Sequence, residues 1–404
     1  MKFLSLLLLF LALFFLSGCD EAVRIVSVER EDHFTLNIGV LEDQIALFNL
    51  EGSRGLRPTN ISMRDGLFYI TDSNGAKILK YNSYGDILYM IYNEETNPPP
   101  LTLRPYSDGS LLTRWAVPFP LLEPGLIVVD SRNHLFVQDI LPGERHSYDL
   151  VTRSMLDNII LHFDSDGTFI DFIGREGIGG TPFTRIEGLY TTIRDELVVI
   201  CRYPGGWNIY WFDHNGVFLF LVQLSNEAIP IPVVSEDLIP SLESIAVGPD
   251  SRKLFVKVDY YKNVFDESTN TRMGVESDSS IVWIMNAEDG VWERQIYIPF
   301  FEYTYIEQNR QLTARMIYSF MGVISNERLF FSFPVDQGYS ILILSSGSGE
   351  SVMQHQGIIR VDNDEQQLNV FSLSEDGILS GLLAGDWQLK LVWWRTDKLL
   401  TESS

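Results

Sequence analysis

Residues 60–92, which read NISMRDGLFYITDSNGAKILKYNSYGDILYMIY, decide the fold of this chain. Four short runs rich in Ile, Leu, Phe and Tyr are separated by polar segments, and such runs are typical of β-strands. Two of the connections, Arg64-Asp-Gly66 and Asn82-Ser-Tyr-Gly85, end in glycine, as tight turns between antiparallel strands often do. The stretch therefore predicts a four-stranded antiparallel unit.

The same pattern recurs along the chain and indicates a repeat fold. It returns clearly in residues 126–173 and 186–224, and more weakly near 244–298, 317–354 and 368–395. The leucines that open the second strand of each unit are Leu67, Leu135, Leu197, Leu254, Leu329 and Leu379. Their mean spacing is about 62 residues, and four strands per repeat of this length form the blade of a propeller. We therefore predict an all-β, six-bladed β-propeller of four-stranded antiparallel blades.

The two ends of the chain predict how the ring closes. The last unit has three clear strands, at 368–374, 377–384 and 387–395, while residues 44–50 (QIALFNL) read as a fourth strand. An unfilled edge would leave backbone groups without partners, so we expect this amino-terminal strand to complete the last blade. The propeller is expected to span residues 33–404.

The stretch 163–183 (FDSDGTFIDFIGREGIGGTPF) resembles the NHL-type propeller repeat, as does Leu67-Phe-Tyr-Ile-Thr-Asp-Ser-Asn74 followed by Ile78-Leu-Lys-Tyr81. The likeness covers most of the chain after about residue 43, although the final His-Leu of the family motif is not evident. It implies an NHL-like propeller and no particular activity, because these propellers are mostly binding platforms with diverse partners.

The first nineteen residues predict a targeting signal. Residues 3–16 (FLSLLLLFLALFFL) are almost unbroken apolar residues, and Leu16-Ser-Gly-Cys19 follows them. A run of this length is short for a transmembrane helix and suits a secretory signal; an ordinary cleaved signal and a short anchor helix are the alternatives. The run resembles the bacterial lipoprotein signal. The resemblance implies a lipoprotein signal peptide at 1–18 and lipidation of Cys19 with palmitate-type acyl chains. Residues 19–32 would then be a lipidated tether that attaches the propeller to a membrane of the bacterial cell envelope, with the leaflet left open.

The charge of the chain limits its partners. There are 30 Lys and Arg against 54 Asp and Glu, a net charge of -24. Such a chain repels phosphate backbones, so nucleic acid is excluded as a partner, and docking on anionic lipid through a basic patch is disfavoured. The other cysteine, Cys201, lies in an apolar run (ELVVIC) and is expected to be a buried, inert thiol. We expect a monomeric propeller.

Loop lengths predict one working face. Strands alternate in direction, so turns from first to second and from third to fourth strand lie at one end, and all other connections lie at the opposite end. Five long connections, at 93–124, 140–157, 223–242, 259–280 and 297–315, fall on that second face, which we call the long-loop face. Long loops in compact folds are usually functional, and aromatic residues dominate interface energies. The candidate interface residues are Trp115, Tyr260, Tyr261, Phe300, Phe301, Tyr303 and Tyr305. The alternative is that these residues only pack the loops onto the body. The leading hypothesis is a protein-binding or scaffold propeller.

The chemistry-bearing residues point only weakly to catalysis. The six histidines form no ligand cluster in the sequence, no Gly-x-Ser-x-Gly motif is present, and no catalytic residue is assigned. Glu123, Glu187 and Glu243 each stand just before an innermost strand, and Asn60 occupies the same place in the first unit. Carboxylate and amide oxygens suit Ca²⁺ or another divalent cation. Glu187-Gly188 also resembles the start of a sugar-lactonase propeller, where the glutamate binds a divalent metal. The alternatives to a binding protein are therefore a metal-dependent lactonase-like hydrolase or lyase, and a solute- or glycan-binding sensor. We expect no cofactor in the leading hypothesis.

Overall fold

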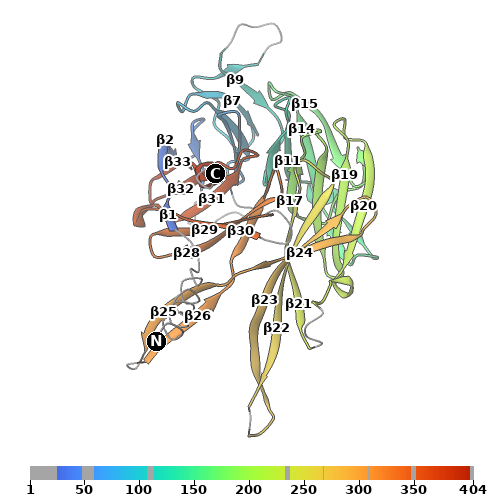
Figure 1. Ribbon diagram of the computed structural model, residues 1–404. Coiled ribbons are helices and arrows are strands. Elements are labelled where there is room, and N and C mark those ends of the chain that lie inside the picture. Colours follow the sequence, from blue (N-terminus) through green and yellow to red (C-terminus); the bar gives the residue numbers. More distant parts are fainter. Residues whose placement is uncertain are drawn as a thin grey trace, which may run out of the picture.

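The structure is a computed structural model that describes residues 25–47, 59–106, 113–232, 237–266, 268–307, 310–346 and 352–400 (Figure 1). The described residues form six sheets of four to six strands, numbered here as sheets 1 to 6 along the chain, and two separate two-stranded sheets.

Within each sheet, strands that are neighbours in space are mostly also neighbours in the sequence. Sheet 1 contains β4 (Asn60–Arg64), β5 (Leu67–Asp72), β6 (Lys77–Tyr81), β7 (Ile87–Tyr92), β9 (Trp115–Pro118) and β8 (Arg104–Pro105). Sheet 2 contains β10 (Ile127–Val129), β11 (Leu135–Ile140), β14 (Asn158–Phe163), β15 (Phe169–Gly174) and β16 (Gly177–Ile178). Sheet 3 contains β17 (Arg185–Thr191), β18 (Leu197–Tyr203), β19 (Gly206–Phe212) and β20 (Phe218–Ser225).

The second half of the chain continues the series. Sheet 4 contains β21 (Ile239–Val247), β22 (Lys253–Phe265), β23 (Arg272–Asn286) and β24 (Trp292–Ile298). Sheet 5 contains β27 (Ser319–Ile324), β28 (Arg328–Val335), β29 (Gly338–Ser346), β30 (Val352–Arg360) and β1 (Ile25–Ser27). Sheet 6 contains β31 (Leu368–Leu373), β32 (Leu379–Ala384), β33 (Gln388–Trp394), β2 (Arg30–Ile38) and β3 (Gln44–Ile45). The two-stranded sheets are β12 (Ser147–Asp149) with β13 (Ser154–Leu156), and β25 (Phe301–Glu307) with β26 (Arg310–Met316). Short 3₁₀ helices lie at Gly143–Arg145, Asn226–Ala228, Asn363–Glu365 and Thr396–Leu400.

The predicted all-β propeller is confirmed. The first strands β31, β4, β10, β17, β21 and β27 each contact the next one around the centre. Within the described residues, six clusters of buried apolar side chains each lie between two neighbouring sheets, and the sixth joins sheets 5 and 6. The repeated leucines stand at the start of the second strands, and all except Leu67 are fully buried. The leucines recur with the period of the repeat because each sheet packs an apolar side chain at this position against its neighbours.

The strand that completes sheet 6 is not the one that the sequence suggested. β2 pairs antiparallel with β33 from Arg30 with Trp394 to Asn37 with Gln388. Of the predicted strand at 44–50, only Gln44–Ile45 is a strand, and it adds in parallel to β2; residues 48–50 lie outside the described residues. The prediction failed because β2 begins with the polar run Arg-Glu-Asp-His, which hides the alternation of Phe34, Leu36 and Ile38 against the core.

The predicted tether at 19–32 is also too long. Its residues 25–27 form β1, which pairs in parallel with β30, and its residues 30–32 open β2. Residues 1–18 and Cys19 lie outside the described residues. No helix in the described part of the chain is long and apolar enough to cross a membrane.

Four of the predicted long loops contain strands of their own: 93–124 contains β8 and β9, 140–157 contains β12 and β13, and the other two form long ribbons. The segment 259–280 continues β22 and β23 beyond the sheet as a paired ribbon that reaches Phe265 and Arg272. The segment 297–315 contains the β25–β26 ribbon, whose pairs run from Phe301 with Met316 to Glu307 with Arg310. Figure 1 shows both ribbons extending well beyond the body of the propeller. Backbone pairing extends these loops because each segment satisfies its own hydrogen bonds as a hairpin.

Candidate functional site

A central cavity of about 510 Å³ runs between the first strands of the sheets. It is lined by residues of β4, β10, β17, β21, β27 and β31 and by turns that follow them. This volume falls within the range of small-molecule sites in proteins. The geometry of a propeller places it there, because neighbouring twisted sheets diverge around the axis.

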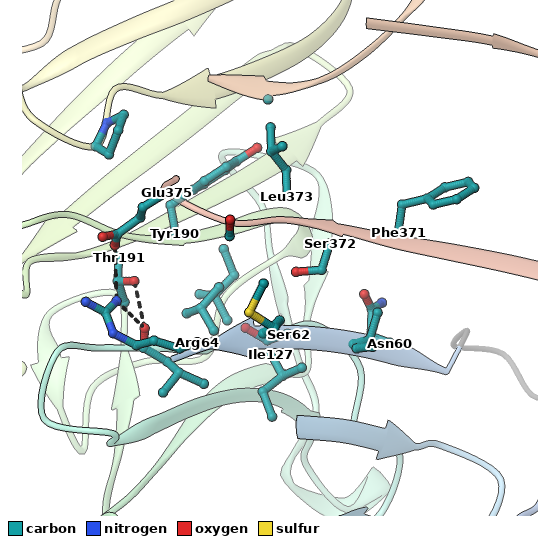
Figure 2. A pocket seen from close by; sticks show the side chains of 18 of the residues that line it. Asn60, Ser62, Arg64, Ile127, Tyr190, Thr191, Phe371, Ser372, Leu373 and Glu375 are labelled. Carbon is teal, nitrogen blue, oxygen red and sulfur yellow. Dashed lines mark hydrogen bonds and ion pairs between the residues drawn. The ribbon is translucent and has the colours of Figure 1, made fainter. Parts of the chain in front are cut away.

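One side of the cavity is polar. Asn60 and Ser62 project from β4, because every second residue of a strand lies on the same side. Figure 2 shows them facing the same space as Ser372 of β31. Within the described residues, none of these three half-buried side chains makes a hydrogen bond to another protein group. Ile127, Leu373 and other apolar side chains line further parts of the wall.

Arg64 crosses the cavity at the end near the tight turns (Figure 2). Its Nη1 lies 3.3 Å from the carbonyl oxygen of Val129 and 3.1 Å from Oε1 of Glu375. Thr191 Oγ1 donates to the same Val129 oxygen at 3.2 Å. The Arg64 Nε is buried and makes no hydrogen bond within the described part of the chain. This end of the cavity is therefore bridged by a paired charge.

β-Bulges shape three first strands. The register of β17, β21 and β27 shifts by one residue at Glu187, Glu243 and Met321. A bulge redirects the extra side chain relative to the regular strand. Glu187 and Met321 line the central cavity, whereas Glu243 is exposed and accepts a hydrogen bond of 2.8 Å from Ser241. The sequence singled out two of these positions but gave no sign of the bulges.

A second cavity of about 1010 Å³ opens beside the first. Asn60, Leu126 and Glu187 line both cavities, so the two adjoin. Glu123 lines the second cavity, and its backbone N–H donates to Asp139 Oδ1 at 2.7 Å. The structure thus brings Asn60, Glu123 and Glu187 to one region and leaves Glu243 outside it.

The carboxylates do not form a recognisable metal centre. Glu187 Oε1 lies 2.8 Å from Nε of the exposed Arg185, which gives it a positive neighbour. No group of three His, Cys, Asp or Glu side chains within the described ranges is arranged to hold a metal ion. Of the four donors that the sequence suggested, Glu187 forms an ion pair, Asn60 and Glu123 line the second cavity, and Glu243 is exposed.

The predicted interface aromatics differ in how far they are buried. Tyr260 is fully buried: its hydroxyl donates to the Pro230 oxygen and accepts from Trp283 Nε1, so the structure removes it from the candidate surface. Burial raises its pKa to about 12. Trp115 donates from Nε1 to the Asp166 oxygen at 2.8 Å and packs near Tyr89, so it holds its loop on the body.

The others remain at least partly accessible. Tyr261 and Phe300 are half-buried, and Phe301 stacks on Phe333 with ring centroids 4.5 Å apart. Tyr303 is 52% exposed and stacks on Tyr305 at 5.4 Å. In the ribbon, Phe301 therefore packs on the body of the protein, whereas Tyr303 is accessible to solvent.

Most of the strongly exposed apolar side chains lie on the long-loop side of the sheets, although they are spread over sheets 1, 2, 4 and 6 and the β25–β26 ribbon. Those at least 70% exposed are Leu101, Leu150, Val151, Met273, Ile306 and Trp387. Among the described residues of the tight-turn side, Tyr84, between β6 and β7, is exposed to this extent, and Ile193, Val217 and Val291 are just over half exposed. Cys201 is a buried free thiol whose pKa is raised by burial, as the sequence suggested.

Comparison with known proteins adds little beyond the architecture. No family model and no curated protein matches this chain. Among solved structures, the β-propeller domain of the Trilobed protease from Pyrococcus furiosus is similar over 83% of this chain and 93% of that one, at 9% identity and a TM-score of 0.37. A luciferin-regenerating enzyme is similar over 84% and 90%, at 10% identity and a TM-score of 0.34. KlHsv2 with a replaced loop is similar over 55% of this chain and only 57% of that one, at 10% identity and a TM-score of 0.27. Likenesses this weak carry no argument about activity.

Proposed function

We propose that this protein is a membrane-anchored lipoprotein of the bacterial envelope that binds a protein partner through its long-loop face. The observation that carries the proposal is that, within the described residues, six of the seven large apolar side chains at least 70% exposed lie on that side of the sheets. Single exposed apolar residues are common on protein surfaces, so it is the unequal division between the two faces that favours a covering partner. The net charge of -24 favours a neutral or basic partner.

The architecture behind this proposal is a ring of six NHL-like blades, one for each of sheets 1 to 6, closed by β2. The six inter-sheet clusters and the pairing of β2 with β33 support this count. Four strands per sheet, with additional edge strands, is the usual blade plan.

The anchor is the acylated Cys19. The apolar run at 3–16 and the Leu-Ser-Gly-Cys sequence that follows it support this assignment. More than one acyl chain gives stable attachment to a bilayer. Growth with an alkyne-tagged fatty acid tests it: wild type becomes labelled, and Cys19→Ser does not. Labelling of Cys19→Ser would overturn the anchor.

The central cavity supports a second candidate function, the binding of a small solute. Its volume and the unpartnered side chains of Asn60, Ser62 and Ser372 favour this role over hydrolysis. A lactonase-like reaction would need Glu187 and Glu243 to converge on one metal, and Glu243 does not line the cavity. Calorimetry with neutral sugars and polyols, on wild type and on Asn60→Ala, tests the candidate.

Site-specific photocrosslinking in cells tests the main proposal. A photoreactive amino acid at Leu150 or Met273 of the long-loop face should give one recurrent protein adduct. The matched control is the same substitution at Tyr84, which is 86% exposed on the opposite face and should give none. Equal adducts from both faces, or none from either, would refute the role of the long-loop face.

A further inference from the structure

The β25–β26 ribbon is an amphipathic sheet with an uncovered apolar side. Register places Phe301, Tyr303 and Tyr305 on the same side as Met316, Ala314 and Leu312 of the paired strand. The opposite side carries the ion pair of Arg315 with Glu302 and the pair Thr304 with Thr313, with one apolar residue, Ile306, near the tip. Such alternation normally marks a sheet with one side against an apolar medium.

The protein covers this apolar side in part, most fully at Phe301. Phe301 stacks on Phe333 and meets Tyr318 edge-to-face with centroids 5.9 Å apart, which fixes the ribbon to sheet 5. Met316, which pairs with Phe301, is 43% exposed, and further out Tyr303 is 52% and Leu312 38% exposed. An isolated two-stranded hairpin is only marginally stable in water, so a covering medium would stabilise the ribbon.

A second copy of the chain does not fit this surface well. Seven residues at about 3.3 Å and two strands about 5 Å apart give an apolar side of roughly 230 Å². Two such sides bury far less than the roughly 1,000 Å² that a stable interface needs. Two chains of charge -24 would also repel each other.

The chain itself points to the bilayer as the occupant. β1 pairs with β30 of sheet 5, so the chain leaves the propeller from the sheet that holds the base of the ribbon. Five residues separate Cys19 from Ile25, and a span this short reaches at most about 20 Å. An acylated Cys19 therefore keeps the outer edge of sheet 5 close to the membrane. This step rests on the lipid anchor proposed above.

Charge and residue type agree with this placement. Residues 301–316 contain Glu302, Glu307, Arg310 and Arg315, so the ribbon is neutral although the chain is strongly acidic. A neutral ribbon adds no repulsion of its own towards anionic headgroups. Tyrosine is favoured at the boundary between headgroups and acyl chains.

We propose that the apolar side of the β25–β26 ribbon, with Tyr303, Tyr305, Leu312 and Met316, is a second membrane contact that rests on the lipid surface beside the acyl anchor. Anchor and ribbon together would fix the edge of sheet 5 towards the bilayer and leave the blades further away free for a protein partner.

Fluorescence of single labelled cysteines tests the proposal on the full lipidated chain in phosphatidylcholine vesicles. A polarity-sensitive thiol dye is attached at Tyr303→Cys, or at Met316→Cys as a second probe of the apolar side. Thr304→Cys, on the opposite side of the ribbon, and Tyr84→Cys, on the tight turns, are the matched controls. Cys201 is fully buried and does not compete for the dye.

The expected result is a blue shift at Tyr303 and Met316, with loss of emission when the lipids carry spin labels on their acyl chains. Thr304 should be quenched less, and Tyr84 not at all. Vesicle flotation and the mass of the amino-terminal peptide report the anchor separately. A chain that floats and is acylated but shows no quenching at Tyr303 overturns the ribbon contact and leaves the anchor intact. An unacylated chain still quenched at Tyr303 overturns the anchor and supports the ribbon. A photocrosslink from Tyr303 to a protein, without quenching by lipid, assigns the surface to that protein and also overturns the proposal.

Discussion

The closing strand β2 and the β25–β26 ribbon have the same kind of sequence but opposite surroundings. Both carry an apolar side chain at every second position: Phe34, Leu36 and Ile38 in β2, and Phe301, Tyr303 and Tyr305 in β25. The side chains of β2 pack in the core between sheets 6 and 1. In β25, Phe301 packs on Phe333, and Tyr303 and Tyr305 lie further out along the ribbon. Alternation therefore shows that a strand has an apolar side, but not what covers it.

The closing strand is also fastened by charge. Arg30 pairs with the buried Glu365 at 2.6 Å, and Lys390 reaches the same carboxylate at 2.6 Å. Trp393 donates to Glu31 at 2.9 Å. Burial alone would raise the pKa of Glu365, but the hydrogen bonds from Arg30 and Lys390 outweigh it and lower the pKa to about 2. These contacts therefore stabilise sheet 6, where β2, from near the amino terminus, pairs with β33, from near the carboxyl terminus.

Removal of the closing strand should have the largest effect. Deleting residues 25–38 exposes the edge of β33 and removes Leu36 from the core, so the free energy of unfolding should fall by more than about 4 kcal/mol, with aggregation. Deleting residues 20–24 alone should leave the melting temperature unchanged. Thermal melting of both forms decides; equal stability would mean that β2 does not close the ring.

Loss of the buried carboxylate should have an intermediate effect. Glu365→Gln leaves Arg30 and Lys390 without their counter-charge and should cost about 2 kcal/mol, below the value for a fully buried pair because both cations are partly exposed. The folded pKa lies below the ordinary 4.5, so this contribution is present above pH 4.5 and disappears as the pH falls towards 2. Urea titrations should show that acid-dependent loss in wild type and not in Glu365→Gln. Glu29→Gln, which breaks the exposed pair with Lys398, is the control and should change nothing measurable.

Changes on the outer ribbon should have the smallest effect on stability. Tyr303→Ser with Leu312→Ser should shift the free energy of unfolding by less than about 0.5 kcal/mol, because both side chains are already substantially exposed. Phe301→Ala, at the packed base, should cost about 3 kcal/mol, because it removes the stack on Phe333. If the two variants lost equal stability, the outer ribbon would be packed in solution, and the contrast with β2 would fail.

The candidate site was predictable only in part. Asn60, Glu123 and Glu187 were found because residues just before a first strand must come near the propeller axis. Ser62, Arg64 and Ser372 were missed, although the alternation in NISMR is the signal that places Ser62 and Arg64 beside Asn60. Glu243 failed although it occupies the same bulge position as Glu187, because its carboxylate is exposed and accepts a hydrogen bond from Ser241. Tyr260 failed because an aromatic residue in a long connection has the same appearance whether it is buried or open.

The sequence by itself determined the repeated four-stranded unit and the positions of its tight turns, because backbone alternation and turn chemistry are local. Asp65 and Gly66, for example, adopt the positive φ angles of 52° and 73° that an Asp-Gly turn favours. Only the tertiary structure decided which amino-terminal segment closes the ring, which carboxylates meet, and which apolar sides stay uncovered. Those outcomes depend on contacts between residues hundreds of positions apart, such as Arg30 with Glu365, and packing chooses among segments whose local patterns are equally suitable.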